Sequence, residues 1–477
     1  MTLLAVLVAG ALLLALWAAR RAPDPLEYFA AGRRAGAWLV GIAGTAAAVS
    51  AFTFVGGPGL FAAVGMGSLW IILSAPLTGA LQCWAVGERV VEMAQRHRPV
   101  TVPELLELRF GRGARGAAAV VVVVGCIASL AVQAKAAAVL GPALLGVPGA
   151  LAACLAIGAT AAYTASGGMR AGILADAAQG ALMAVAATVL AAAVLGAAGG
   201  PAAALETVRA TRPQLLGSFG TVPPARAASW YLLFCIGTLA QPHYVQKFLF
   251  LRSREELRLL PAVLTGALFL TLTVWLGVGL GGAALAARGS FSIAHPDDLA
   301  SQAVAAVGPW AVALAGVAVL AALMSTAASF LNQAAAAVTR DLPASLGRPP
   351  GTVPAARVVT VAVACAAVVV GLGSQRAVAL LGVAGWGFFT AALLAPLALG
   401  LNWRGARPRG VTAAIVAGAT VDLALEAVHS ALPAGLEPGL AGAAVATLVL
   451  VGMSLRGDSS GAAESVERRE SHRALGP

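Results

Sequence analysis

Long apolar segments recur from one end of the chain to the other, and they restrict the fold more than any other feature. Each is long enough to cross about 30 Å of hydrocarbon as a helix. Hydrophobic residues make up 60% of the 477 residues and charged residues only 11%, which is too little charge to cover the surface of a soluble protein. The pattern predicts an all-α polytopic membrane protein. We expect about thirteen membrane-spanning helices, at residues 2–19, 38–62, 67–87, 117–139, 147–166, 172–197, 228–248, 259–286, 308–333, 357–374, 376–401, 411–430 and 438–455.

Basic residues are distributed unevenly among the segments that connect these helices. The segments on one side carry about five times as many Arg and Lys residues as those on the other. Because cytoplasmic loops are the basic ones, we expect the N-terminus outside the cell and the C-terminus in the cytoplasm. The net charge of +11 then reflects membrane topology, and we expect a lipid bilayer and no nucleic acid as a partner.

The two ends of the chain are interpreted from their charges. Arg20 and Arg21 follow the first apolar run, whereas the charges of a signal peptide precede it, so we expect a retained first helix. The tail at 456–477 is polar and charged, and we expect it to be disordered. The cysteines and histidines show no spacing typical of a disulfide framework or a metal site, and we do not expect an enzyme.

Two of the expected spans contain residues that interrupt a helix. Gly56-Gly57-Pro58-Gly59 lies in the span at 38–62, and Pro242 lies in the span at 228–248. Backbone groups freed in lipid are tolerated only where they line a cavity or meet a ligand. Paired interruptions in corresponding halves of a chain indicate the binding site of a transporter, although Gly and Pro are also common in ordinary membrane helices.

The interrupted spans each open a block of five helices, so we expect two inverted repeats. The expected organisation is a first helix and cytoplasmic loop (1–37), repeat 1 (38–197), an extracellular loop (198–227), repeat 2 (228–401), two further helices (402–455) and the tail (456–477).

A polar cluster occurs within the apolar span at 308–333. Ala322, Ser325 and Thr326 stand at i, i+3 and i+4, so that one carbonyl and two hydroxyls share a helix face. Carbonyls from an unwound turn near Ala46 and Val49 could complete about five oxygen ligands for a monovalent cation. Alternatively, the hydroxyls bond to carbonyls of their own helix or pack as small groups between helices.

Several motifs together resemble the sodium:solute symporter family, which includes sodium/proline, sodium/pantothenate, sodium/sialic acid and sodium/glucose transporters. The resemblance implies a fold of the leucine-transporter (LeuT) type, with one helix before the core and two after it. It implies a sodium-coupled symporter that imports a small organic solute, works as a monomer and lies in the bacterial cytoplasmic membrane. The motifs are YFAAGR (28–33), SAFTFVGGPG (50–59), TVPELLELRFG (101–111), YTASGGMRAGILADAAQ (163–179), QPHYVQKF (241–248) and LMSTAASFLNQAAAAVTRDL (323–342).

The resemblance also implies a sodium site. Its ligands are the carbonyls of Ala46, Val49 and Ala322 and the hydroxyls of Ser325 and Thr326.

Asp176 and Gln179 match family positions near the path by which sodium leaves toward the cytoplasm. An ionisable residue within a span is a functional candidate by default. The alternative is that Asp176 reaches out to the cytoplasmic interface beside Arg170. Ala48 replaces an aspartate of the proline transporters, and we therefore expect one sodium ion per cycle.

The resemblance places the solute between the unwound parts of the two interrupted spans. Phe52, Phe234 and Thr238 replace larger aromatic residues of the proline transporters, which argues against proline. Lys135 either pairs with a carboxylate of the solute or extends outward to the interface. The candidate solute-binding residues are Ser50, Phe52, Thr53, Tyr163, Phe234, Thr238 and Lys135.

Other functions remain open at this stage. The same fold could serve a proton-coupled or uncoupled carrier, in which Asp176 or Lys135 would titrate. A solute-sensing receptor is a further alternative, which the short tail after residue 455 disfavours.

Overall fold

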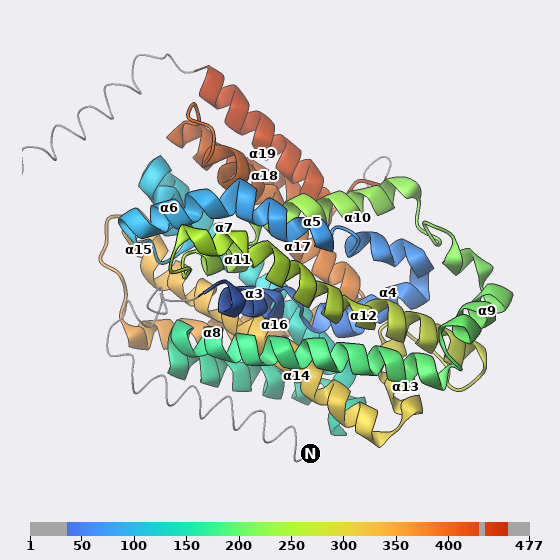
Figure 1. The fold of residues 1–477 in the computed structure, drawn as a ribbon. Helices are drawn as coiled ribbons and strands as arrows, with labels where there is room; N and C mark the ends of the chain where they lie inside the picture. The colour runs from blue at the N-terminus through green and yellow to red at the C-terminus, as the bar shows by residue number, and fades with distance from the viewer. Residues whose placement is uncertain (1–35, 429–434, 457–477) are drawn as a thin grey trace, which may run out of the picture.

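The computed structural model describes residues 36–428 and 435–456, which form a bundle of helices joined by short loops (Figure 1). The expected first helix at 2–19 and the tail beyond residue 456 lie outside the described residues. The α-helices are α3 (Ala37–Ala48), α4 (Gly57–Val64), α5 (Ala75–Gln82), α6 (Glu88–His97), α7 (Val102–Leu145), α8 (Gly149–Ala197), α9 (Pro201–Thr211), α10 (Pro224–Gly237), α11 (Pro242–Phe248), α12 (Leu260–Ala287), α13 (Asp298–Val307), α14 (Pro309–Ala336), α15 (Leu342–Ser345), α16 (Val353–Gly373), α17 (Val378–Leu394), α18 (Pro408–Ala427) and α19 (Pro438–Leu455). Turns of 3₁₀ or π geometry include η2 (Phe52–Gly56), η3 (Gly65–Ile71), η4 (Cys83–Gly87), η6 (Thr238–Ala240), η8 (Ala337–Asp341) and η9 (Ala395–Gly400).

Within the described ranges, nine helical stretches are long and apolar enough to cross a membrane. Two of the other expected spans appear as the shorter apolar helices Ala37–Ala47 and Gly149–Ala165, of which the second lies within α8. The expected span at 228–248 is divided among α10, η6 and α11, and the span at 2–19 is not described. The fold is therefore an all-α membrane bundle, while the count of thirteen spans stays a prediction.

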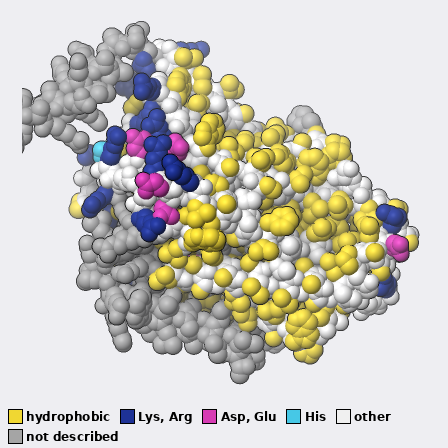
Figure 2. Space-filling view, in the orientation of Figure 1, with side chains coloured by type: hydrophobic (Ala, Val, Ile, Leu, Met, Phe, Trp, Pro, Cys, Tyr) yellow, Lys and Arg dark blue, Asp and Glu magenta, His cyan; other side chains and the backbone are white. Residues whose placement is uncertain are grey.

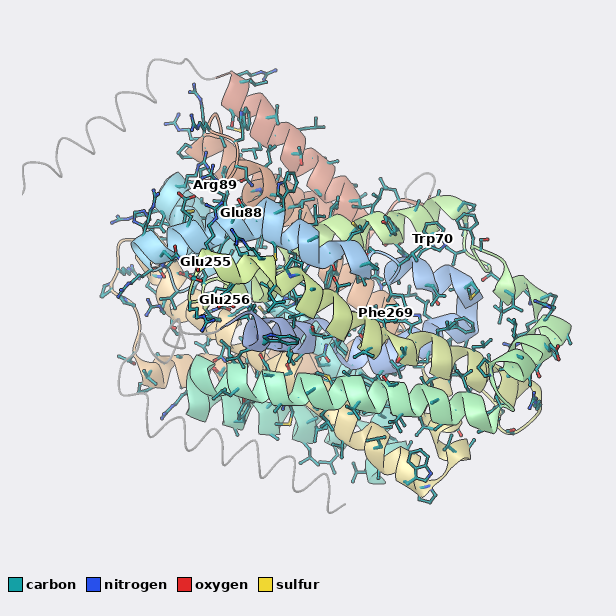
Figure 3. All side chains as sticks on the ribbon, viewed as in Figure 1. Trp70, Glu88, Arg89, Glu255, Glu256 and Phe269 are labelled. Carbon is teal, nitrogen blue, oxygen red and sulfur yellow. The ribbon has the colours of Figure 1, made fainter. Side chains whose placement is uncertain are left out.

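The surface agrees with a membrane location. Figure 2 shows a broad hydrophobic band between two ends of the bundle that carry charged side chains. One of these two ends carries Glu88, Arg89, Glu255 and Glu256, which are labelled in Figure 3. We call this end of the bundle the charged end. Phe269 on α12 lies in the band between the ends and is 68% exposed. In lipid, such an exposed apolar side chain is in a favourable solvent.

The first interrupted span breaks between α3 and η2. The backbone leaves the helical region at Val49, whose φ and ψ are −88° and 114°. Two amide groups beyond the break donate to side-chain acceptors. Ala51 N–H donates to Gln133 Oε1 (3.2 Å), and Phe52 N–H donates to Ser50 Oγ (3.1 Å). These two bonds satisfy backbone donors that would otherwise be unpaired inside the bundle.

The glycines and the proline that predicted this break lie just beyond it. Pro58 occupies the first turn of α4, where a residue without an N–H is tolerated. A Cβ on Gly57 would stand 2.4 Å from the indole of Trp275, and one on Gly56 would stand 3.0 Å from the amide nitrogen of Ala379. The glycines thus permit close packing against α12 and α17, and the backbone opens at Val49, within the turn that was expected to be unwound.

The second interrupted span breaks at Gln241, between η6 and α11. Gln241 has φ and ψ of −78° and 112°, the extended conformation that a residue before proline prefers. Pro242 then begins α11. The Gln241 side chain donates to the carbonyls of Gly237 (3.1 Å) and Trp386 (3.2 Å), which holds the break against α17. The break therefore lies where the sequence places it.

Glu256 at the charged end holds the start of α3 from more than 200 residues away along the chain. Its carboxylate accepts the Ala37 N–H at 2.6 Å and pairs with Arg252. The backbone bond lowers the pKa of Glu256 below its ordinary value of 4.5, and the Arg252 guanidinium lowers it further against the opposing effect of burial. The carboxylate therefore stabilises the fold fully above pH 4.5, and this contribution is lost as the pH falls through the lowered pKa.

We expect Glu256→Gln to remove this part of the acid sensitivity. The thermal unfolding temperature of the purified protein is measured above and below pH 4.5. On acidification it should fall less for the variant than for the wild type. Glu255→Gln is the matched control, because Glu255 lies next to Glu256 and accepts its hydrogen bond from Ser253 within its own loop. Equal acid sensitivity in the wild type and Glu256→Gln would contradict the prediction.

Candidate functional site

A cavity of about 140 Å³ lies where the two interrupted spans meet α5, α7, α12, α14 and α17. Its walls are mainly apolar, and several polar side chains face it. The polar lining residues are Ser50, Thr53, Ser74, Thr78, Gln82, Ser129, Gln133, Thr238, Gln241, His243, Lys247 and Thr326. An apolar pocket with a few directed polar groups is typical of a site for a small organic molecule.

Thr326 of the expected sodium site faces this cavity, near the break in the first interrupted span. Ala46 and Val49, at the end of α3, and Ala322, on α14, belong to one buried cluster. Thr326 lines the cavity together with Ala47 and Ser50 from the break in the first interrupted span. The unwound turn and the polar face of α14 are therefore neighbours, in a region away from lipid.

Thr326 differs from three other buried threonines of the bundle. Thr45, Thr360 and Thr390 each donate their hydroxyl to the carbonyl four residues earlier, at 2.9–3.0 Å. The Thr326 hydroxyl is buried and has no hydrogen-bond partner among the described residues. The alternative that this hydroxyl bonds to its own helix therefore does not hold. A buried polar atom without a protein partner requires an explanation, and coordination of a cation is one.

Ser325 is bound differently from Thr326. Its hydroxyl donates to Asp176 Oδ1 at 2.8 Å, and the side chain is almost fully buried. A hydroxyl that ligates a cation must direct its hydrogen away from the ion, and Asp176 accepts that hydrogen here. The lone pairs of Ser325 Oγ are left for another partner.

Asp176 lies inside the bundle, where the structure excludes the alternative that it reaches the interface. The residue is 3% exposed, and its second oxygen pairs with Lys247 Nζ at 2.5 Å. Gln179, one turn further along α8, is also buried. Lys247 was not predicted as a site residue, whereas it is 5% exposed and lines the cavity. Its position inside the apolar span at 228–248 was the signal that could have identified it.

Aromatic side chains form the wall between the two breaks. Phe52 from η2 stacks on Phe234 from α10 with ring centroids 6.0 Å apart. Phe234 stacks in turn on Trp386 of α17 at 4.9 Å, and Phe52 contacts the edge of Trp275 at 5.3 Å. The spacing along the chain gives no sign that the two tryptophans reach this site, and neither was predicted.

The other expected solute-binding residues divide into two groups. Ser50, Thr53 and Thr238 line the cavity, and Thr238 accepts a hydrogen bond from Gln82 of α5. Tyr163 and Lys135 are outside the cavity lining. Tyr163 is buried against Met324 and other residues of α14.

Lys135 caps the end of another helix. Its ammonium group donates to the carbonyl of Ser374, directly after α16, at 2.8 Å. A lysine near the last carbonyls of a helix is favourably placed for the helix dipole. This contact explains Lys135 without a carboxylate of the solute.

Comparison with known proteins extends these observations. A sequence model of the sodium:solute symporter family matches residues 28–418. The chain is 26% identical over 414 residues to the sodium/pantothenate symporter of Escherichia coli (strain K12), a match that covers 84% of this chain and 85% of that protein. It is 25% identical over 423 residues to the osmoregulated proline transporter OpuE of Bacillus subtilis (strain 168), with 86% and 85% covered.

Two solved structures share the fold. The structure of a Na⁺-coupled sialic acid symporter in a substrate-bound outward-open state superposes with a TM-score of 0.79 at 18% identity, covering 96% of this chain and 98% of that one. MHP1, a nucleobase-cation-symport-1 family transporter, superposes with a TM-score of 0.58 at 13% identity, covering 90% and 95%. At these identities, the likeness establishes the arrangement of the helices.

Proposed function

The chain belongs to the sodium:solute symporter family, and from this premise we propose that it is a secondary active symporter that couples sodium entry to the import of a small organic solute. The observation that carries the proposal is the buried, unpartnered hydroxyl of Thr326 beside the open turn at Val49. The proposed ligands are the carbonyls of Ala46, Val49 and Ala322 and the hydroxyls of Ser325 and Thr326. Neutral oxygens from an unwound turn suit sodium in transporters of this kind.

The proposed cycle is alternating access, with the N-terminus outside and the C-terminus in the cytoplasm. Sodium joins α14 to the open end of α3 and so holds the cavity in a form that binds the solute. The two repeats then rock around the filled site and release both cargoes inward. One charge that moves through 100 mV supplies about 2.3 kcal/mol. That energy supports roughly fiftyfold accumulation of the solute from voltage alone.

The solute is proposed to lie against the aromatic wall of Phe52, Phe234 and Trp386, near the hydroxyls of Ser50 and Thr238. Stacked aromatic rings favour a compact apolar part of the solute. Hydroxyl and glutamine side chains can bind its polar groups. A carboxylate, an amino acid or a vitamin-like molecule combines these features. The related proteins named above transport pantothenate, proline and sialic acid, which makes these three the first compounds to test.

Uptake into proteoliposomes tests the proposal directly. We expect a sodium gradient, but not a choline gradient, to drive accumulation of a labelled solute, and we expect the same result at two pH values. Uptake in choline that follows a pH gradient would indicate proton coupling, and equal uptake in all conditions would indicate an uncoupled carrier. Binding of ²²Na⁺ to the purified protein provides a test that needs no solute, and its absence would contradict sodium coupling.

A further inference from the structure

Asp176, Lys247 and Ser325 form a buried polar contact that joins three helices. Asp176 lies on α8, Lys247 on α11 and Ser325 on α14. Each oxygen of the carboxylate has its own donor, Ser325 Oγ at 2.8 Å and Lys247 Nζ at 2.5 Å. The side chains of Asp176 and Lys247 are 4% and 7% exposed, so the pair is shielded from water. Charges in such a place interact much more strongly than charges at a surface.

The contact acts on the candidate sodium site through Ser325. Because Asp176 accepts the only hydroxyl proton of Ser325, the lone pairs of that oxygen are available to a cation. Asp176 is therefore a positioning group for one of the proposed sodium ligands. Its negative charge would also attract the ion directly if nothing balanced it.

Lys247 supplies that balance. It extends from the short helix that follows the second break, and it is the one lysine or arginine among the residues that line the cavity. No aspartate or glutamate of the described chain lines the cavity beside it. An unpaired buried carboxylate would be strongly unfavourable. The ammonium group compensates Asp176 at a place where a second small cation could otherwise bind.

We propose that Lys247 is a tethered cation that neutralises Asp176, so that the site holds a single sodium ion and binds it weakly enough for release into the cytoplasm. The inference rests on the proposed sodium symport and goes beyond it, since it assigns to one side chain the control of sodium affinity and stoichiometry. Lys247 is a positioning residue in this role, because it acts on the ion through Asp176 and Ser325.

Equilibrium binding of ²²Na⁺ to the purified full-length protein tests the inference without knowledge of the solute. We expect Lys247→Met to bind sodium at least about tenfold more tightly than the wild type, because Asp176 then keeps an uncompensated charge. Asp176→Asn should bind sodium at least about tenfold more weakly, because the lysine charge is then unbalanced. The double variant should return to within about threefold of the wild type, since both charges are gone.

Two further variants separate this role from a structural one. Lys247→Arg keeps the charge and should retain the affinity of the wild type. Arg376→Met removes the cation of another partly buried ion pair, with Glu426, and should leave sodium binding unchanged. If Lys247→Met does not fold, Asp176→Asn and the double variant still decide the question, because asparagine retains an acceptor for Ser325.

The outcomes that overturn the inference differ from those that overturn sodium symport. Suppose that the wild type binds sodium and that folded Lys247→Met and Asp176→Asn bind it with the same affinity. This result would contradict the proposed role of Lys247 but not the proposed sodium symport. A wild-type protein that binds no sodium would overturn both.

Discussion

Thr326→Val is expected to weaken sodium binding by roughly 10- to 100-fold, while the sodium-free protein becomes no less stable. Valine has the shape of threonine without the hydroxyl, so the packing of α14 is retained. The contact of a hydroxyl with a charged group is worth about 1.5–3 kcal/mol, which corresponds to this range of affinities. In the absence of the ion, the Thr326 hydroxyl has no partner, so its removal eliminates an unsatisfied buried group.

The two readouts of this experiment are ²²Na⁺ binding and thermal unfolding in choline. Thr360→Val is the matched control, because Thr360 is equally buried in α16 and bonds to the carbonyl of Ala356 at 2.9 Å. The control should lose some stability and keep its sodium affinity, which is the opposite pattern. Wild-type sodium affinity in Thr326→Val would contradict the proposed site.

The second large effect is expected for Gly65→Ala, which should destabilise the whole fold. Gly65 ends α4 with φ of 69° and ψ of −143°, a conformation that residues with a side chain rarely adopt. A Cβ at this position would lie 2.1 Å from the carbonyl oxygen of Leu215, in the segment between α9 and α10. Backbone strain of about 1–3 kcal/mol and overpacking of about 1–3 kcal/mol together exceed what most single substitutions cost.

Yield after extraction and the temperature of thermal unfolding measure this effect. Gly158→Ala is the control, since Gly158 lies within α8 and a Cβ there would meet no atom within 4 Å. Alanine in a helix interior is favoured over glycine, so the control should be neutral or slightly stabilising. A Gly65→Ala protein as stable as the control would show that the loop near Leu215 moves away without cost.

Much of the site could be predicted because its signals are local. Ala322, Ser325 and Thr326 share a face in any α-helix, so their spacing alone is sufficient to group them. Pro242 marks the second break through a steric effect on the residue directly before it. The family resemblance indicated Phe52, Phe234 and Thr238, and all three line the cavity.

The contacts that the prediction missed depend on packing between distant helices. Lys247 and Asp176 are 71 positions apart, and neither residue indicates the other along the chain. Trp275 and Trp386 reach the cavity only because α12 and α17 lie against the two breaks. Lys135 was expected either to pair with the solute or to extend to the interface, whereas it donates to the carbonyl of Ser374, 239 residues away.

The amino-acid sequence by itself determined the class of this protein, the apolar segments and the helix face that carries the two hydroxyls. These properties depend on composition, on the length of apolar runs and on the fixed periodicity of a helix, which act over short stretches of chain. Only the tertiary structure decided which partner Asp176 receives and which of the two hydroxyls has none. Each of these contacts depends on which side chains from other helices lie next to the carboxylate or the hydroxyl. The packing of distant helices determines those neighbours.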